Sequence, residues 1–192
     1  MAEKNRTRLD YPKDSIDLVK AGLLFVAVKL GDLLGEIVVV GGVVPSLLVD
    51  QDSAQERHIG TTDLDLALSL SVLDDEKYRD ISGRLREAGF KPVQKSNQKI
   101  VRQTWEMTGK LGWITIDFLI PRSDKANPKR LLQDLEKDFG AIRTRGLELA
   151  FIDWQQIVLD GITIDGDRAK RSVQVAGPAA MLVLKASGSS TR

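Results

Sequence analysis

Two aspartates one residue apart are the side chains of this sequence whose types and spacing most directly suggest chemistry. Asp63 and Asp65 lie in an alternating apolar segment, residues 63–70. In a β-strand successive side chains point to opposite faces, so the two carboxylates share one face and the intervening leucines share the other. Adjacent carboxylates repel each other unless a positive group lies between them, and a hard magnesium-type cation prefers such oxygen ligands. The segment therefore predicts a strand with one acidic, metal-binding face.

Upstream of these acids, two glycines follow a β-branched run. Residues 36–40 predict a strand that stops at Gly41 and Gly42, and residues 43–49 predict a short helix. Glycine lets a backbone approach a ligand closely, and the N-terminus of a following helix favours phosphate. The segment is typical of a turn that passes against a phosphate group.

Downstream, a third aspartate lies in another alternating segment. Residues 100–107 and 113–120 predict a β-hairpin around a Gly-Lys-Leu-Gly turn. Asp117 shares one side of its strand with Thr115, and the apolar side chains share the other. If this hairpin strand lies next to the first acidic strand, Asp117 lies beside Asp63 and Asp65.

The order of these features resembles the polymerase-β-like nucleotidyltransferase superfamily: apolar strand, Gly-Gly, Asp-x-Asp, then a further strand aspartate. His58 and Thr61, just ahead of the acids, resemble its minimal, AbiEii-like branch, several members of which are toxins of toxin–antitoxin systems. The resemblance covers roughly residues 15–186 and is most specific at 37–42 and 57–68. It implies an α/β (α+β) nucleotidyltransferase fold, in which helices flank a mixed β-sheet.

The resemblance also implies an activity, which is transfer of a nucleoside monophosphate from a triphosphate to an acceptor hydroxyl with two Mg²⁺ ions. Residues 175–186 resemble the third motif of the family, a strand, a turn and a helix ending in a lysine. The implied catalytic and metal-binding residues are Asp63, Asp65 and Asp117, and the implied nucleotide-binding residues are Gly41, Gly42, His58, Thr61 and Lys185.

The acceptor stays open at this point. The toxin-like branch implies tRNA or another RNA, together with a cognate antitoxin protein. One alternative is a small-molecule, antibiotic-type adenylyltransferase, and another is a non-catalytic nucleotide- or partner-binding protein on the same fold. Two features depart from the family: a longer interval between Gly42 and Asp63, and a Ser/Gly tail where larger members continue in a helical region. Basic clusters that would bind an RNA backbone if they met at one rim are Lys125, Lys129 and Arg130; Arg143 and Arg145; and Arg168, Lys170 and Arg171.

Composition limits the other possibilities. The 192 residues fit one domain over 14–186, with a flexible arm over 1–13 and a linker-like tail over 187–192. Its 28 basic and 27 acidic residues give a net charge of +1, so bulk charge favours no polyanionic partner. The chain has no cysteine and one histidine, which excludes disulfides, cysteine catalysis and multi-histidine zinc sites. The longest apolar run, 21–28, is far shorter than the roughly 20 residues that cross a bilayer, so we expect a cytoplasmic protein.

The other elements follow from apolar periodicity and turn residues. They are a helix over about 14–34, a helix over 74–88, a strand over 90–93, a helix from the cap Asn127 to about Phe139, strands over 147–152, 162–164 and 172–175 with turns at 160–161 and 165–166, and a helix from 177 through 185.

Overall fold

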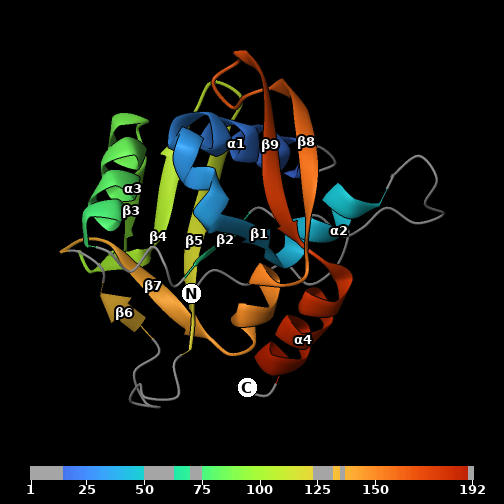
Figure 1. The fold of residues 1–192 in the computed structure, drawn as a ribbon. Helices are drawn as coiled ribbons and strands as arrows, with labels where there is room; N and C mark the ends of the chain where they lie inside the picture. The colour runs from blue at the N-terminus through green and yellow to red at the C-terminus, as the bar shows by residue number, and fades with distance from the viewer. Residues whose placement is uncertain (1–14, 50–62, 70–74, 123–131, 135–136, 190–192) are drawn as a thin grey trace.

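The computed structural model describes residues 15–49, 63–69, 75–122, 132–134 and 137–189 (Figure 1). Helices and strands alternate up to α3 (Asp75–Glu87), and mostly strands follow it; short 3₁₀ segments (η) join some of these elements. In chain order the elements are α1 (Ser15–Leu30), η2 (Gly31–Glu36), β1 (Ile37–Val40), η3 (Gly41–Val43), α2 (Val44–Leu48), β2 (Asp63–Leu68), α3 (Asp75–Glu87), β3 (Lys91–Gln94), β4 (Ile100–Thr108), β5 (Trp113–Pro121), β6 (Leu132–Asp134), β7 (Gly140–Thr144), η5 (Leu147–Phe151), β8 (Trp154–Ile162), β9 (Arg168–Ala176) and α4 (Pro178–Ser189).

The described strands form one mixed sheet in the order β3-β4-β5-β2-β1-β9-β8. β7 continues the sheet beside the end of β5, and β6 pairs with β7. The pairs β1–β9, β2–β5 and β5–β7 are parallel, and the other pairs are antiparallel. The mixed α/β class predicted from the sequence is therefore confirmed, as is the hairpin of β4 and β5.

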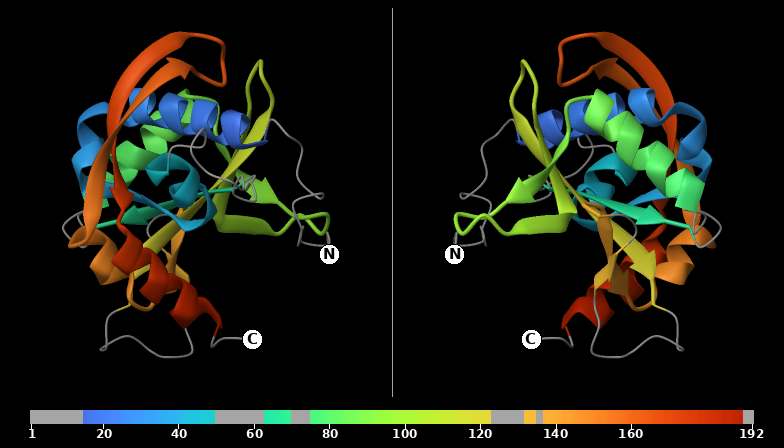
Figure 2. Two further views of the ribbon diagram at one scale, coloured as in Figure 1. Left: turned by 90° about the vertical axis from the view of Figure 1, so that its right-hand side faces the viewer. Right: turned by 90° about the vertical axis from the view of Figure 1, so that its left-hand side faces the viewer.

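Helix α1 packs on one face of this sheet. Its sequence is apolar on most sides, and its residues from Ala21 to Ala27 are buried. Gly22 allows the close approach, because a Cβ at this position would lie 2.5 Å from Cδ1 of Ile114 on β5. Helix α3 lies beside α1, and Figure 2 shows both helices on the side of the sheet around which the β8–β9 ribbon bends. The leucines of β2 point to the face of the sheet that these helices cover.

An aromatic cluster fills the core beside α3. The Phe139 ring lies 5.6 Å from Trp105 of β4 and 4.9 Å from Phe118 of β5, in edge-to-face contacts. All three side chains are fully buried. Such pairs add about 0.5–1.5 kcal/mol beyond the burial of their area. Phe139 thus anchors the segment before β7 to the sheet.

Arg84 joins α3 to the end of α1. Its guanidinium donates to the Leu30 carbonyl at 2.7 Å, to Asp32 at 2.5 Å and to both carboxylate oxygens of Asp80 at 3.0 Å. The hydrogen bond from Arg84 lowers the pKa of the Asp32 carboxyl below its ordinary 3.8. This contact ties α3 to the carbonyl at the C-terminal end of α1.

Several element predictions are wrong. The helix predicted up to Phe139 is contradicted at 132–134, where β6 pairs antiparallel with residues 140–142 of β7. Its start at Asn127 lies outside the described residues. The first helix ends as an α-helix at Leu30 and continues as the 3₁₀ segment η2, because Gly31 takes a φ of +57° that an α-helix does not accommodate.

The C-terminal third differs most from the sequence prediction. Residues 147–151 form η5 rather than a strand, and the turn predicted at 160–161 lies inside the nine-residue strand β8. No separate strand covers 162–164, since β8 ends at Ile162 and the turn at 165–166 follows. Cross-strand pairing with β9 overrides the weak turn signal of Asp160-Gly161. Helix α4 runs to Ser189, into the segment predicted as a tail.

Within the described ranges, no helix is long and apolar enough to cross a membrane.

Candidate functional site

The strand register brings the predicted acids together. β2 and β5 are parallel neighbours, and in their register Asp65 is the partner of Asp117 while Asp63 is the partner of Thr115. Paired residues of adjacent strands point to the same face of a sheet, so the three carboxylates share a face. Their strand neighbours Leu64 and Leu66 are buried on the other face, whereas the three aspartates are half-buried.

Two threonine hydroxyls hold these carboxylates. The Thr104 hydroxyl of β4 donates to Oδ1 of Asp117 at 2.5 Å, and the Thr115 hydroxyl donates to Oδ1 of Asp63 at 2.6 Å. Thr104 is also the register partner of Asp117, so the row runs across three strands from Thr104 through Asp117 to Asp65. Each hydroxyl fixes one oxygen of its carboxylate. Sequence reasoning assigned no role to either threonine, although both lie on the polar side of an alternating strand.

Gly41 lies at the other end of the row, next to Asp65. The last residue of β1, Val40, is the partner of Asp65, and Gly41 follows with a φ of +78°. A Cβ at Gly41 would lie 1.8 Å from Oδ2 of Asp65, so only glycine leaves room for this carboxylate. The sequence predicted that Gly41 lets the backbone approach a phosphate; in the structure the group against Gly41 is the Asp65 carboxylate. Gly42 lies next to it in η3 and is half-buried.

Lys185 stands apart from this row. His58 and Thr61 lie outside the described residues. Lys185 lies on α4, which extends from the sheet past η5, and its side chain is exposed (Figure 1). The strand register brings together Asp63, Asp65, Asp117 and Gly41, and it does not extend to Lys185.

The three aspartates do not form a complete metal-binding site by themselves. In the part of the chain that the structure describes, no three His, Cys, Asp or Glu side chains converge closely enough to hold an ion. Asp65 and Asp117 are direct partners across β2 and β5, whereas Asp63 lies two residues further along β2. The type of donor still fits a hard divalent cation, because all three side chains offer carboxylate oxygens.

Two of the predicted basic clusters lie far apart in the described part of the chain. Arg143 and Arg145 lie at the end of β7, whereas Arg168 and Lys170 lie at the β8–β9 turn, at the opposite end of the molecule in both views (Figures 1 and 2). Arg168 and Lys170 form ion pairs with Asp160 at 3.3 and 3.5 Å. The cluster at 125–130 lies outside the described residues.

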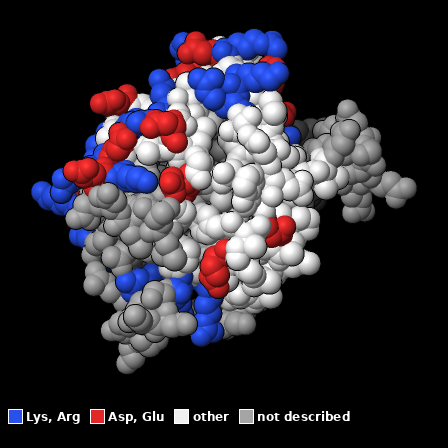
Figure 3. All heavy atoms as spheres, in the orientation of Figure 1, with Lys and Arg blue, Asp and Glu red and all other residues white. Residues whose placement is uncertain are grey.

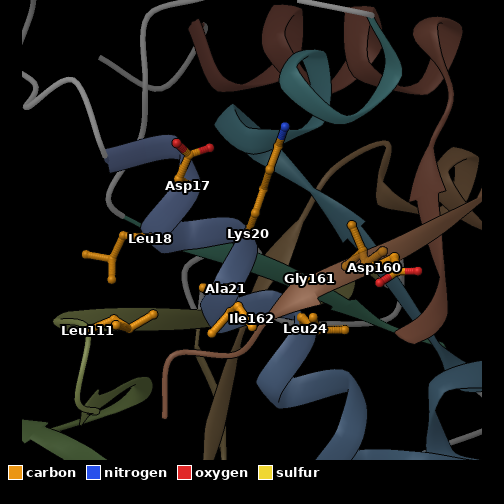
Figure 4. Close-up of a pocket in the computed structure, with 10 residues that line it drawn as sticks. Asp17, Leu18, Lys20, Ala21, Leu24, Leu111, Asp160, Gly161 and Ile162 are labelled. Carbon is orange, nitrogen blue, oxygen red and sulfur yellow. The ribbon is translucent and has the colours of Figure 1, made fainter. Parts of the chain in front are cut away.

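A cavity of about 440 Å³ lies away from the acids, between α1, β8 and the turn that joins β4 to β5. Figure 4 shows Ala21 and Leu24 of α1 and Ile162 of β8 around it, with Leu111 of the turn at one side. Its lining is mainly apolar, and its charged residues are Asp17, Lys20 and Asp160. The cavity lies beside α1, on the side of the sheet opposite the carboxylates, so it is separate from the acid row.

Comparison of the chain with protein-family models, with curated proteins and with solved structures gives no match.

Proposed function

We propose that this chain is a metal-dependent nucleotidyltransferase, with a nucleotidyltransferase fold, that moves a nucleoside monophosphate from a triphosphate to an acceptor hydroxyl. One observation carries the proposal: Asp65 and Asp117 are register partners on adjacent parallel strands, with Gly41 directly against Asp65. The Asp-x-Asp strand, the glycine turn and the third acidic strand thus meet in space as the sequence resemblance requires. The mixed sheet with helices on its flank supports the same assignment.

The three aspartates would hold the two Mg²⁺ ions through their carboxylate oxygens. The bound ions would supply positive charge to the triphosphate and lower the pKa of the attacking hydroxyl. Asp117 is the carboxylate that we assign to accept the proton of this hydroxyl. Its Oδ1 accepts a hydrogen bond from Thr104, which fixes the orientation of the carboxylate.

The neighbouring groups orient the acids. Thr115 fixes Oδ1 of Asp63, and Gly41 confines the Asp65 carboxylate from the β1 side. Gly41 and Gly42 precede α2, so the turn would pass along the phosphates with no side chain in the way. A carboxylate held by a fixed hydrogen bond needs little rearrangement when charge develops, which is how preorganised groups lower a barrier.

The test is incubation with each of the four α-labelled nucleoside triphosphates, magnesium and total tRNA, for the parent chain and for Asp65→Asn. Asp165→Asn is the matched control, because this acid lies in the β8–β9 turn away from the row. We expect label transfer by the parent and the control and none by Asp65→Asn. Label in RNA, in the protein or in an added aminoglycoside identifies the acceptor class. No transfer by the folded parent with any triphosphate and any acceptor refutes the proposal.

A further inference from the structure

The two ends of the sheet differ in how their outer strands are protected. β3 is four residues long, contains Lys91 and Pro92, and has a register shift at Pro92. Short length, lysine, proline and bulges are the devices by which edge strands avoid pairing with another chain. β8, at the other end, is nine residues long, contains no proline or lysine and has Asp160 as its single charge. Among the described residues, β9 is its only strand partner.

The side chains of β8 make this edge apolar. Trp154, Val158 and Ile162 lie on the same face at intervals of four residues, and they are 42%, 56% and 45% exposed. In Figure 3 the charged residues gather over the α3 side and along the β8–β9 turn, whereas the surface over the β9, β8 and α4 side is mostly uncharged. An unpaired strand edge of this kind is a template for β-pairing.

The β8 sequence is Trp-Gln-Gln-Ile-Val-Leu-Asp-Gly-Ile, and its apolar positions are arranged symmetrically about Val158. In an antiparallel pair of two such strands centred on Val158, Trp154 lies opposite Ile162 of the second copy. Aromatic and β-branched side chains are a favourable cross-strand pair. Gln156 lies opposite Asp160, so an amide donor meets the only carboxylate, and the two Asp160 side chains are kept apart. Ile157 lies opposite Leu159 on the other face.

We propose that two copies of this chain associate through β8, antiparallel about a two-fold axis at Val158, and so join their sheets. A second copy is the occupant that fits best, because the apolar positions of β8 meet apolar positions and Gln156 meets Asp160 when the strand is paired with itself. A two-fold axis also closes the interface, which removes the open edge from both partners. The inference does not depend on the proposed enzymatic activity.

Single-cysteine variants test both the association and its register, because the chain contains no cysteine. Directly opposed residues of an antiparallel pair have Cα atoms about 4.5–5.5 Å apart, which is within disulfide range. Val158→Cys therefore cross-links to itself under mild oxidation. Gln156→Cys, an exposed residue of the same strand, does not, because four residues separate it from its own copy, or about 13 Å along the strand.

Light scattering after gel filtration supplies the second readout. The parent is expected to approach twice the chain mass of 21.2 kDa as its concentration rises. Val158→Lys is expected to stay at the chain mass, since two like charges then face each other on the axis. An equimolar mixture with Val158→Glu is expected to recover the dimer. Leu182→Lys is the control, because Leu182 is 71% exposed on α4 and lies outside β8. A parent that stays monomeric, or equal cross-linking of both cysteine variants, overturns the proposal.

Discussion

Replacing Gly41 by alanine tests the geometry at the centre of the candidate site. The added Cβ would lie 1.8 Å from Oδ2 and 2.7 Å from Cγ of Asp65, at a φ of +78°. A left-handed backbone costs an L-residue about 1–2 kcal/mol. Forcing an extra carbon into occupied space typically costs about 1–3 kcal/mol more. We therefore expect Gly41→Ala to lower the free energy of unfolding by about 2–5 kcal/mol.

The matched control is Gly89→Ala. Gly89 has a φ of +91°, but a Cβ there would meet nothing within 4 Å, so this variant carries the backbone cost alone. Both free energies are measured by urea denaturation followed by circular dichroism, with Asp65→Ala and the Gly41→Ala/Asp65→Ala double variant. Removing the carboxylate leaves only its Cβ, 3.0 Å away, so the double variant should recover most of the steric cost.

Two results would refute this reasoning. One is a Gly41→Ala variant that loses no more stability than Gly89→Ala, which would mean that Asp65 is not against the turn. The other is additivity of Gly41→Ala and Asp65→Ala, because residues in contact should show a coupling free energy of about 0.5–3 kcal/mol. If the proposed activity is correct, Gly41→Ala should also lose nucleotidyl transfer under conditions in which it remains folded, whereas Gly89→Ala keeps it.

Three further predictions concern single side chains. Asp153 accepts a hydrogen bond from the Ala180 N–H in the first turn of α4 at 2.9 Å, so Asp153→Ala should cost about 1 kcal/mol in urea denaturation and Asp153→Asn much less. Arg84 lowers the pKa of Asp32, so the stabilisation from this pair is present above the ordinary pKa of 3.8 and is lost as pH falls through the lowered value. The difference in free energy of unfolding between the parent and Arg84→Ala should therefore narrow below pH 3.8. A difference that stays constant with pH would contradict the assignment. Asp117→Asn removes one of the three carboxylates that we assign to metal binding. Magnesium should raise the thermal midpoint of the parent alone, and an equal rise in Asp117→Asn would count against metal binding by Asp117.

The elements that build the site could be predicted from the sequence because their signals are local. Alternation within 63–68 and 113–120 identifies β2 and β5, and the glycines after a β-branched run identify the turn at Gly41. The register that makes Asp65 the partner of Asp117 could not be predicted from such local signals. It depends on the parallel pairing of two strands about fifty residues apart, and periodicity does not specify which strands pair.

The C-terminal third could not be predicted for a related reason. β8 contains Asp160-Gly161, which favours a turn, yet nine cross-strand pairs with β9 hold both residues in the strand. At 147–151 the sequence favours a strand by composition, but Gly146 enters the left-handed region with a φ of +75° and starts the 3₁₀ segment instead. In both places tertiary pairing or a single backbone conformation decides against the local preference.

The acid row places like charges on adjacent strands, and this connects its structure to its proposed role. Asp65 and Asp117 face each other as like charges, and Gly41 brings backbone against one of them at the entropic cost of a glycine. The threonine hydroxyls offset part of this cost at Asp63 and Asp117, where each donates to a single oxygen. A scaffold selected for stability alone would favour an apolar or oppositely charged partner opposite Asp65. In the proposed function, Mg²⁺ ions would supply the positive charge that such a row of carboxylates attracts.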